Sequence, residues 1–427
     1  MKKSGKGGIF LDINKLLEGT DCVCGKKHTC DIKYVYIEKN AVRRLCDVCS
    51  EHRHILLVAD ENTFSAAGAA VTEVLSQKIM NKVIFSGKEI LIPDETAIET
   101  VESQLAGADL ILGIGSGVIQ DLCKYVSFGS KIPYVIYATA PSMDGYASNG
   151  AAMITGGMKV TYPAGLPLAI VADTDILRNA PLEMIKAGYG DVIGKFSALN
   201  DWKLSRCVNG EYFCEYIYNL TYEQIERTIS LADGILKRNE ESIKTLTEAL
   251  VVIGILMSFA GSSRPASGSE HHLSHFFEIT GILDGTDYLP HGIDVAYSTF
   301  ETAKVREKIL SEKFPVKSFR QSEGEYESVM NSLYKSSAKG CMELQTKVGN
   351  YAKDRTEIYL EKEDEIRSIL AEMPSSEEIS RFLSLAELDI NDFYSFYGRE
   401  KIENAVLYAK DLKDRYTVLW MNYDFSE

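Results

Sequence analysis

Three of the seven histidines of this chain lie within five residues, in the segment SGSEHHLSHFFE at positions 267–278. His271 and His275 are four residues apart, so on a helix they share one face, whereas His272 points elsewhere. His291 follows in PHGIDVAY, at the start of another segment with a helical pattern. Such imidazoles can share one cation, or one can bind the cation while another contacts a substrate. The alternative is a surface helix that is only rich in histidine.

A carboxylate that could complete such a site occurs in AGYGDVIGKFSALNDW, where Asp191 follows two glycines at the start of a predicted helix. Lys195 comes four residues later and lies on the same helical face. A helix cap and a surface ion pair are the simpler interpretations of these two residues. Together with the imidazoles, however, Asp191 forms a ligand set that suits a divalent transition metal with open coordination positions.

A glycine turn in LILGIGSGVIQDLCKYVS indicates a second kind of site. A predicted strand runs into Gly113, Gly115 and Gly117, and a helix begins near Val118. Glycines let the backbone approach a pyrophosphate, and the free N–H groups of a helix N-terminus attract it. Asp121 lies in the first turn of that helix. The spacing G-x-G-x-G is not the usual G-x-G-x-x-G, so a plain tight turn remains the alternative.

Two further strand ends carry polar residues. Asp60 ends the strand-like run HILLVAD, where an acid commonly bonds an adenosine ribose hydroxyl or caps the next helix. The segment YATAPSMDGYAS places Thr139, Ser142, Asp144 and Ser148 after another strand. An aspartate that only forms the turn is the alternative interpretation of Asp144.

The N-terminal region holds six potential soft-metal ligands in 28 positions. A C-x-C pair with a C-x-x-C pair could bind a structural zinc. Otherwise these residues are reduced cysteines and a histidine in a strand-rich segment. The six residues are Cys22, Cys24, His28, Cys30, Cys46 and Cys49.

The surrounding pattern predicts the elements that position these residues. Short apolar runs alternate with helical segments up to about residue 178, which predicts a parallel sheet covered by helices, with ligands at the carboxyl ends of its strands. Beyond about residue 180, long helix-period segments dominate, for example 223–261. The predicted strands are 54–60, 81–87, 108–117, 132–141 and 167–177, and the helices between them include 62–80 and 94–107.

The expected fold is therefore an α/β, Rossmann-like N-terminal domain followed by an all-α C-terminal domain, with the active site in the cleft between them. A Cys-rich segment at 1–50 would belong to the first domain, residues 51–178 would bind the dinucleotide, and residues 179–427 would bind metal and substrate.

Composition restricts the partners. The net charge of −15 over 427 residues argues against binding to nucleic acid or to an anionic membrane surface, although a local basic pocket could hold a small anion. No uninterrupted run approaches the roughly 18 apolar residues of a membrane span, and the N-terminus has no long apolar signal region. We expect a cytoplasmic protein, with cysteines that are reduced or metal-bound.

Five motifs, in the same order, resemble sn-glycerol-1-phosphate dehydrogenases, a family within the group that contains glycerol dehydrogenase, iron-dependent alcohol dehydrogenases and dehydroquinate synthase. The resemblance covers about residues 50–300. The motifs are GSGVIQD, TAPSMDGYAS, GDVIGKFSALNDW, SSRPASGSEHHLSH and the later HG.

The resemblance implies a role for each matching residue. Metal ligands would be Asp191, His271 and His291, and the catalytic and substrate-contacting residues would be Asp144, Asp191 and His275. Lys195, and after it Arg264, are our candidates for binding a phosphate, because both lie close in sequence to the metal ligands. Dinucleotide contacts would be Asp60 at the adenosine end, together with Gly117, Val118, Ile119, Gln120, Asp121, Thr139, Ala140, Pro141, Ser142 and Ser148.

The implied reaction is the reversible reduction of dihydroxyacetone phosphate, a small phosphorylated triose, to sn-glycerol 1-phosphate. NADH or NADPH would supply the hydride, and one zinc, nickel or iron(II) ion would polarise the ketone. The alternatives are a polyol dehydrogenase with an unphosphorylated substrate, a dehydroquinate-synthase-like cyclase, and a catalytically silent protein that binds nucleotide or zinc. A homodimer is the commonest homo-oligomer, and the sequence leaves the oligomeric state open.

Overall fold

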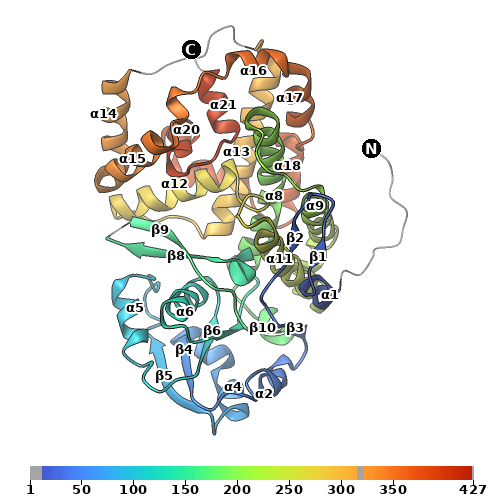
Figure 1. Ribbon diagram of the computed structural model, residues 1–427, viewed down its shortest axis with the longest axis vertical. Helices are drawn as coiled ribbons and strands as arrows, with labels where there is room; N and C mark the ends of the chain where they lie inside the picture. Colours follow the sequence, from blue (N-terminus) through green and yellow to red (C-terminus); the bar gives the residue numbers. More distant parts are fainter. Residues whose placement is uncertain (1–11, 157, 315–321, 426–427) are drawn as a thin grey trace.

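A six-stranded parallel sheet forms the centre of the N-terminal half in the computed structural model, which describes residues 12–156, 158–314 and 322–425 (Figure 1). Every strand pair in this sheet is parallel. The inner strands are almost wholly buried, as expected where helices cover both faces. The sheet order is β3 (Tyr34–Glu38), β10 (Ala169–Asp173), β7 (Tyr134–Ala138), β6 (Leu110–Gly115), β4 (Ile55–Asp60), β5 (Ile79–Phe85).

The five predicted strands are therefore confirmed. Four of them are shorter than predicted, and β5 begins and ends two residues earlier than the predicted strand 81–87. The sequence analysis missed the edge strand β3 and two antiparallel hairpins. One hairpin pairs β1 (Thr20–Asp21) with β2 (Lys27–His28), and the other pairs β8 (Gly150–Thr155) with β9 (Met158–Pro163).

Helices cover the sheet and connect its strands. The predicted helix 62–80 ends earlier, because Leu75 closes α4 and Ile79 already belongs to β5. The helices of this half are α1 (Ile13–Leu17), α2 (Arg44–Val48), α3 (Glu61–Thr63), a π-helical turn (Phe64–Gly68), α4 (Ala69–Val74), α5 (Glu95–Glu102), α6 (Gly117–Ser130) and α7 (Thr174–Leu177).

The remainder of the described chain is helical, which confirms the predicted fold class (Figure 1). Its centre is the long, largely buried α8, which packs against α9, α11, α12 and α13. The helices are α8 (Leu182–Asn209), α9 (Glu215–Ser230), α10 (Ala232–Leu236), α11 (Glu240–Ala260), α12 (Ser269–Asp284), α13 (His291–Ser311), α14 (Glu323–Tyr334), α15 (Ala338–Val348), α16 (Thr356–Glu361), α17 (Glu363–Leu370), α18 (Ser376–Ser384), α19 (Ile390–Tyr397), α20 (Arg399–Tyr408) and α21 (Val418–Asp424).

Helix α11 is long and apolar enough to cross a membrane by length and composition, and it is the one such helix among the described residues. Within the fold, however, 83% of its apolar window is buried. It packs against α9 and against the short helix η3 (Asp144–Ala147) that follows β7. Its apolar character is therefore that of a core helix between the sheet side and the helical side of the molecule.

Candidate metal and dinucleotide site

Three potential metal ligands converge from three helices. Asp191 lies on α8, His271 on α12 and His291 at the start of α13, and one ligand atom from each lies within 4.8 Å of the others. The spacing predicted from the sequence therefore corresponds to a real cluster, and its carboxylate and two imidazoles are ligands that divalent transition metals accept.

Glycines next to two of these ligands allow the convergence. A Cβ atom on Gly190 would lie 2.3 Å from the carbonyl oxygen of Gly292, and one on Gly292 would lie 2.0 Å from the carbonyl oxygen of Ala187. Real Cβ atoms do not approach a backbone oxygen so closely. Larger residues at either position would separate α8 from α13, and with them Asp191 from His291.

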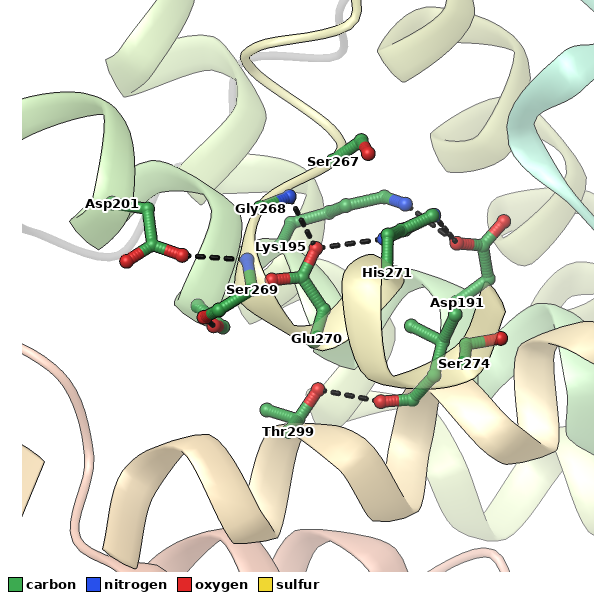
Figure 2. A network of polar contacts seen from close by, with 12 residues as sticks. Asp191, Lys195, Asp201, Ser267, Gly268, Ser269, Glu270, His271, Ser274 and Thr299 are labelled. Atoms are coloured by element: carbon green, nitrogen blue, oxygen red, sulfur yellow. Dashed lines mark hydrogen bonds and ion pairs between the residues drawn. The ribbon is translucent and has the colours of Figure 1, made fainter. Parts of the chain in front are cut away.

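The imidazole of His271 is oriented by its neighbour Glu270 (Figure 2). His271 Nδ1 lies 2.7 Å from Glu270 Oε1, and His271 Nε2 lies 3.7 Å from Asp191 Oδ1. A metal-binding His271 would donate its Nδ1–H to Glu270 and use Nε2 as the ligand atom. Glu270 is fully buried and also accepts a 2.8 Å hydrogen bond from the Gly268 N–H. Burial alone would raise the pKa of Glu270, but the hydrogen bond and charge of His271 outweigh it and lower that pKa. A carboxylate behind a metal-binding histidine is a recurrent arrangement that fixes the tautomer.

We expect Glu270→Gln to weaken divalent-metal binding by roughly 10- to 100-fold, because the amide removes the charge that polarises His271. The fold should persist, since the glutamine oxygen can still accept from Gly268. Metal titration by calorimetry measures the change, with Glu278→Gln on the same helix as the matched control. An unchanged metal Kd in Glu270→Gln would remove Glu270 from this role.

Lys195 lies between two carboxylates. Its Nζ is 2.5 Å from Asp191 Oδ1 and 2.7 Å from Asp144 Oδ2, and the lysine side chain is completely buried. The Asp144 N–H donates to Asp191 Oδ2 over 2.9 Å, so η3 is fixed directly to α8. This contact brings Asp144, from the sheet side, to the metal ligands.

The three charges shift one another's pKa values. Burial and the charge of Asp191 raise the pKa of Asp144, against the opposing effect of Lys195. Burial would also raise the pKa of Asp191, but Lys195, His271 and His291 lower it. Burial lowers the pKa of Lys195, and the two carboxylates more than reverse that effect. The arrangement keeps Asp191 ionised and Lys195 charged.

Of the other residues considered in this region, one borders the ligand cluster and two lie outside it. The ring of His275 lies 6.1 Å from that of His271 and 5.7 Å from that of His291, so His275 borders the cluster. His272 is fully buried and takes no part in it. Arg264 pairs with Glu211 through two hydrogen bonds and donates to the Tyr416 carbonyl, so its Nε and Nη2 are engaged, while Nη1 is buried without a hydrogen-bond partner among the described residues.

The predicted dinucleotide residues lie at the carboxyl ends of adjacent strands. In the sheet, β5 lies on one side of β4 and β6 lies on the other, so the strand order reverses between β4 and β6. Doubly wound sheets bind ligands at such a topological switch point. Asp60 ends β4, and the glycine turn ends the neighbouring β6. Gly115 is required there, because a Cβ atom would lie 2.6 Å from the side chain of Ile119. Ser116, at the start of α6, makes no side-chain cap.

Asp60 also caps the next helix. One of its carboxylate oxygens accepts a 2.8 Å hydrogen bond from the Thr63 N–H. The N-cap role that we weighed against a ribose contact is therefore present. The ribose contact stays a prediction.

The remaining residues predicted to contact the dinucleotide differ in how deeply they are buried. Ile119, Ala140 and Pro141 are buried, so their side chains pack in the core and their backbones alone can face a ligand. Gln120 donates hydrogen bonds to Tyr134 Oη and to the Tyr146 carbonyl, which is also a structural role. Thr139 is buried, and its N–H donates to the Gly115 carbonyl. The half-buried positions are Gly117, Val118, Asp121, Ser142 and Ser148.

Lys124 is a residue of this region that the sequence analysis did not identify. Its buried ammonium contacts Asp121 Oδ1 at 3.2 Å, Ser148 Oγ at 3.2 Å, and the carbonyl oxygens of Gly145 and Gly150. It thus joins α6 to the loop after β7. Because α6 begins at Gly117, Asp121 lies just beyond the first turn in which the sequence analysis placed it. The available signal for Lys124 was its position three residues after Asp121, on the same helical face.

The chain resembles known proteins along most of its length. Residues 36–181 match the family model described as iron-containing alcohol dehydrogenase. A glycerol-1-phosphate dehydrogenase (NAD(P)+) from Halalkalibacterium halodurans is 34% identical over 324 residues, which cover 74% of this chain and 80% of that protein. One from Bacillus licheniformis is 28% identical over 415 residues and covers 93% of this chain and 90% of the relative.

Solved structures share the fold at lower identity. An archaeal halo-thermophilic alcohol dehydrogenase from a Red Sea brine pool superposes with a TM-score of 0.59 at 13% identity, over 91% of this chain and 96% of that one. This likeness confirms the two-part architecture.

Proposed function

The chain belongs to the glycerol-1-phosphate dehydrogenase family of NAD(P)-dependent oxidoreductases, and we propose that it reduces dihydroxyacetone phosphate to sn-glycerol 1-phosphate, reversibly. The observation that carries the proposal is the cluster of Asp191, His271 and His291 at the junction of the sheet and the helices. We also propose that the reaction takes place in the cytoplasm.

The donor set fits one divalent cation. Asp191 Oδ1 has a second lone pair beside its contact with Lys195, and the contact of His271 Nδ1 with Glu270 favours Nε2 as the metal-binding atom of His271. A cation bound there would act as a Lewis acid on the ketone oxygen, and a reduced nicotinamide would supply the hydride. Zinc, nickel and iron(II) all accept these ligands.

The protein's own residues orient the substrate and move the proton. Asp144 and His275 border the ligand cluster from different elements, the first from η3 and the second from α12. We propose that His275, or a water held by Asp144, delivers the proton to the substrate oxygen. The loops after β4, β6 and β7 would bind the dinucleotide.

The proposal is tested by NADH and NADPH oxidation with dihydroxyacetone phosphate, dihydroxyacetone and glyceraldehyde 3-phosphate, each with zinc, nickel or iron(II). We expect metal-dependent oxidation with dihydroxyacetone phosphate, at a kcat/KM well above that for the unphosphorylated ketone. Preference for the unphosphorylated ketone would indicate a polyol dehydrogenase. Absence of net NADH consumption with every ketone would contradict the proposed reaction and leave the cyclase and the catalytically silent protein as the alternatives.

A further inference from the structure

A second cluster of potential metal ligands shares no residue with the Asp191 site and consists mainly of cysteines. Cys22, Cys24, His28 and Cys214 each offer one ligand atom, and these atoms all lie within 4.8 Å of one another. The first three come from the β1–β2 hairpin, and Cys214 is the N-cap residue directly before α9. Figure 1 shows this hairpin beside α9 and α11.

The distances within the cluster match a tetrahedral site. A metal with bonds of about 2.3 Å to sulfur and about 2.0–2.1 Å to nitrogen separates two sulfurs by about 3.8 Å and a sulfur from a nitrogen by about 3.6 Å. Cys22 Sγ lies 3.7 Å from Cys214 Sγ. His28 Nε2 lies 3.5 Å from Cys24 Sγ and 3.4 Å from Cys214 Sγ.

His28 is fixed in the tautomer that such a site needs. Its Nδ1–H donates to the Phe259 carbonyl over 3.0 Å, so Nε2 presents a lone pair toward the thiols. The ring is fully buried and stacks on Phe259 and on Tyr216, at centroid distances of 5.3 and 6.2 Å. A backbone carbonyl behind a ligating histidine is the usual outer support of a metal site.

The hairpin turn places two thiols on the same centre. The Cys22 N–H donates to the Lys26 carbonyl and the Gly25 N–H to the Cys22 carbonyl, and Gly25 adopts a φ of +85°, which favours glycine. Cys24 Sγ also lies 3.3 Å from Tyr212 Oη, and the Lys26 ammonium covers the Tyr212 ring at 3.5 Å. Three thiolates and one dication carry a net charge of −1, which this lysine would offset.

We propose that Cys22, Cys24, His28 and Cys214 bind one structural zinc ion that fixes the N-terminal hairpin to the helical half of the molecule. Four protein ligands leave no open coordination position, so this ion has no catalytic role. The partner of the C-x-C pair is therefore Cys214, and the pairing with Cys46 and Cys49 that the sequence suggested is wrong. Cys46 is exposed on α2, and Cys49 is buried in the core beneath the sheet.

Metal stoichiometry in the full-length protein tests the proposal independently of the catalytic metal. Protein purified from zinc-supplemented medium should contain two metal ions per chain, His291→Ala one, and His291→Ala with Cys214→Ser none. Cys30→Ser, in the same N-terminal segment but outside the cluster, is the matched control and should retain both. A single ion in wild type that disappears completely in His291→Ala would overturn the proposal.

Cobalt substitution in His291→Ala provides a second readout that does not require the Cys214 variant to fold. We expect the intense near-ultraviolet charge-transfer band of thiolate-bound cobalt and the visible bands of a tetrahedral site. A bound cobalt without the thiolate band would contradict cysteine ligation. A Cys22–Cys214 disulfide found by mass spectrometry, with no bound metal, would show a redox pair instead.

Discussion

Replacing His291 with alanine is expected to remove the metal of the Asp191 site and to lower kcat for ketone reduction by roughly 10³-fold or more. Lewis-acid stabilisation is worth several kcal/mol, and each 1.36 kcal/mol corresponds to about a tenfold change in rate. The fold should persist, because His291 is only half-buried, and the helix it begins has Pro290 at its N-cap without a side-chain hydrogen bond. The glycine contact that brings α13 to α8 involves Gly292 and is left intact.

The measurement combines metal analysis, circular dichroism and steady-state kinetics with dihydroxyacetone phosphate. His54→Ala, at an exposed position before β4, is the control for loss of a histidine away from the site. A His291→Ala protein that turns over at the wild-type rate after chelation would refute the metal mechanism. A folded protein that loses only the metal of this site, together with its activity, would support it.

The α/β half could be predicted because its inner strands are buried on both faces and are therefore continuous apolar runs. The edge strand β3, which is partly exposed, was missed. Helices were harder to delimit. Residues 223–261 have one continuous helical pattern, yet Arg238 adopts a left-handed φ of 54° and Asn239 caps α11 with two hydrogen bonds. A further break at Leu231 separates α9 from α10. Such short backbone breaks between good helical segments leave no trace in hydrophobic periodicity.

Ligands within one local motif could also be predicted from the sequence, whereas ligands that lie far apart in the sequence could not be assigned to one site by spacing alone. The i,i+4 spacing on α12 indicated His271 and His275, and the family resemblance indicated the ligand set of Asp191, His271 and His291, whose ligand atoms lie together in the structure. Cys214 lies 186 residues from His28, and only the packing of α9 and α11 against the hairpin brings them together. Glu270 looked like an ordinary acid in a first helical turn, because the sequence does not show that this turn is buried.

Lys195→Met is expected to lower the free energy of unfolding of the metal-free protein by about 3–5 kcal/mol, because it leaves Asp144 and Asp191 buried without their cation. Turnover of dihydroxyacetone phosphate and of dihydroxyacetone should fall together, since both depend on the position of these carboxylates. Lys203→Met on the same helix removes the partly exposed ion pair with Glu372 and should cost no more than about 1 kcal/mol.

Urea unfolding and kinetics with the two ketones separate this structural role of Lys195 from phosphate binding. Equal destabilisation in the two lysine variants would contradict a stabilising role for the Asp144–Lys195–Asp191 contact. A KM that rises for the phosphorylated ketone alone, with stability unchanged, would instead support the phosphate contact predicted from the sequence. The complete burial of the ammonium between two carboxylates favours the first result, because a phosphate would have to displace at least one of them.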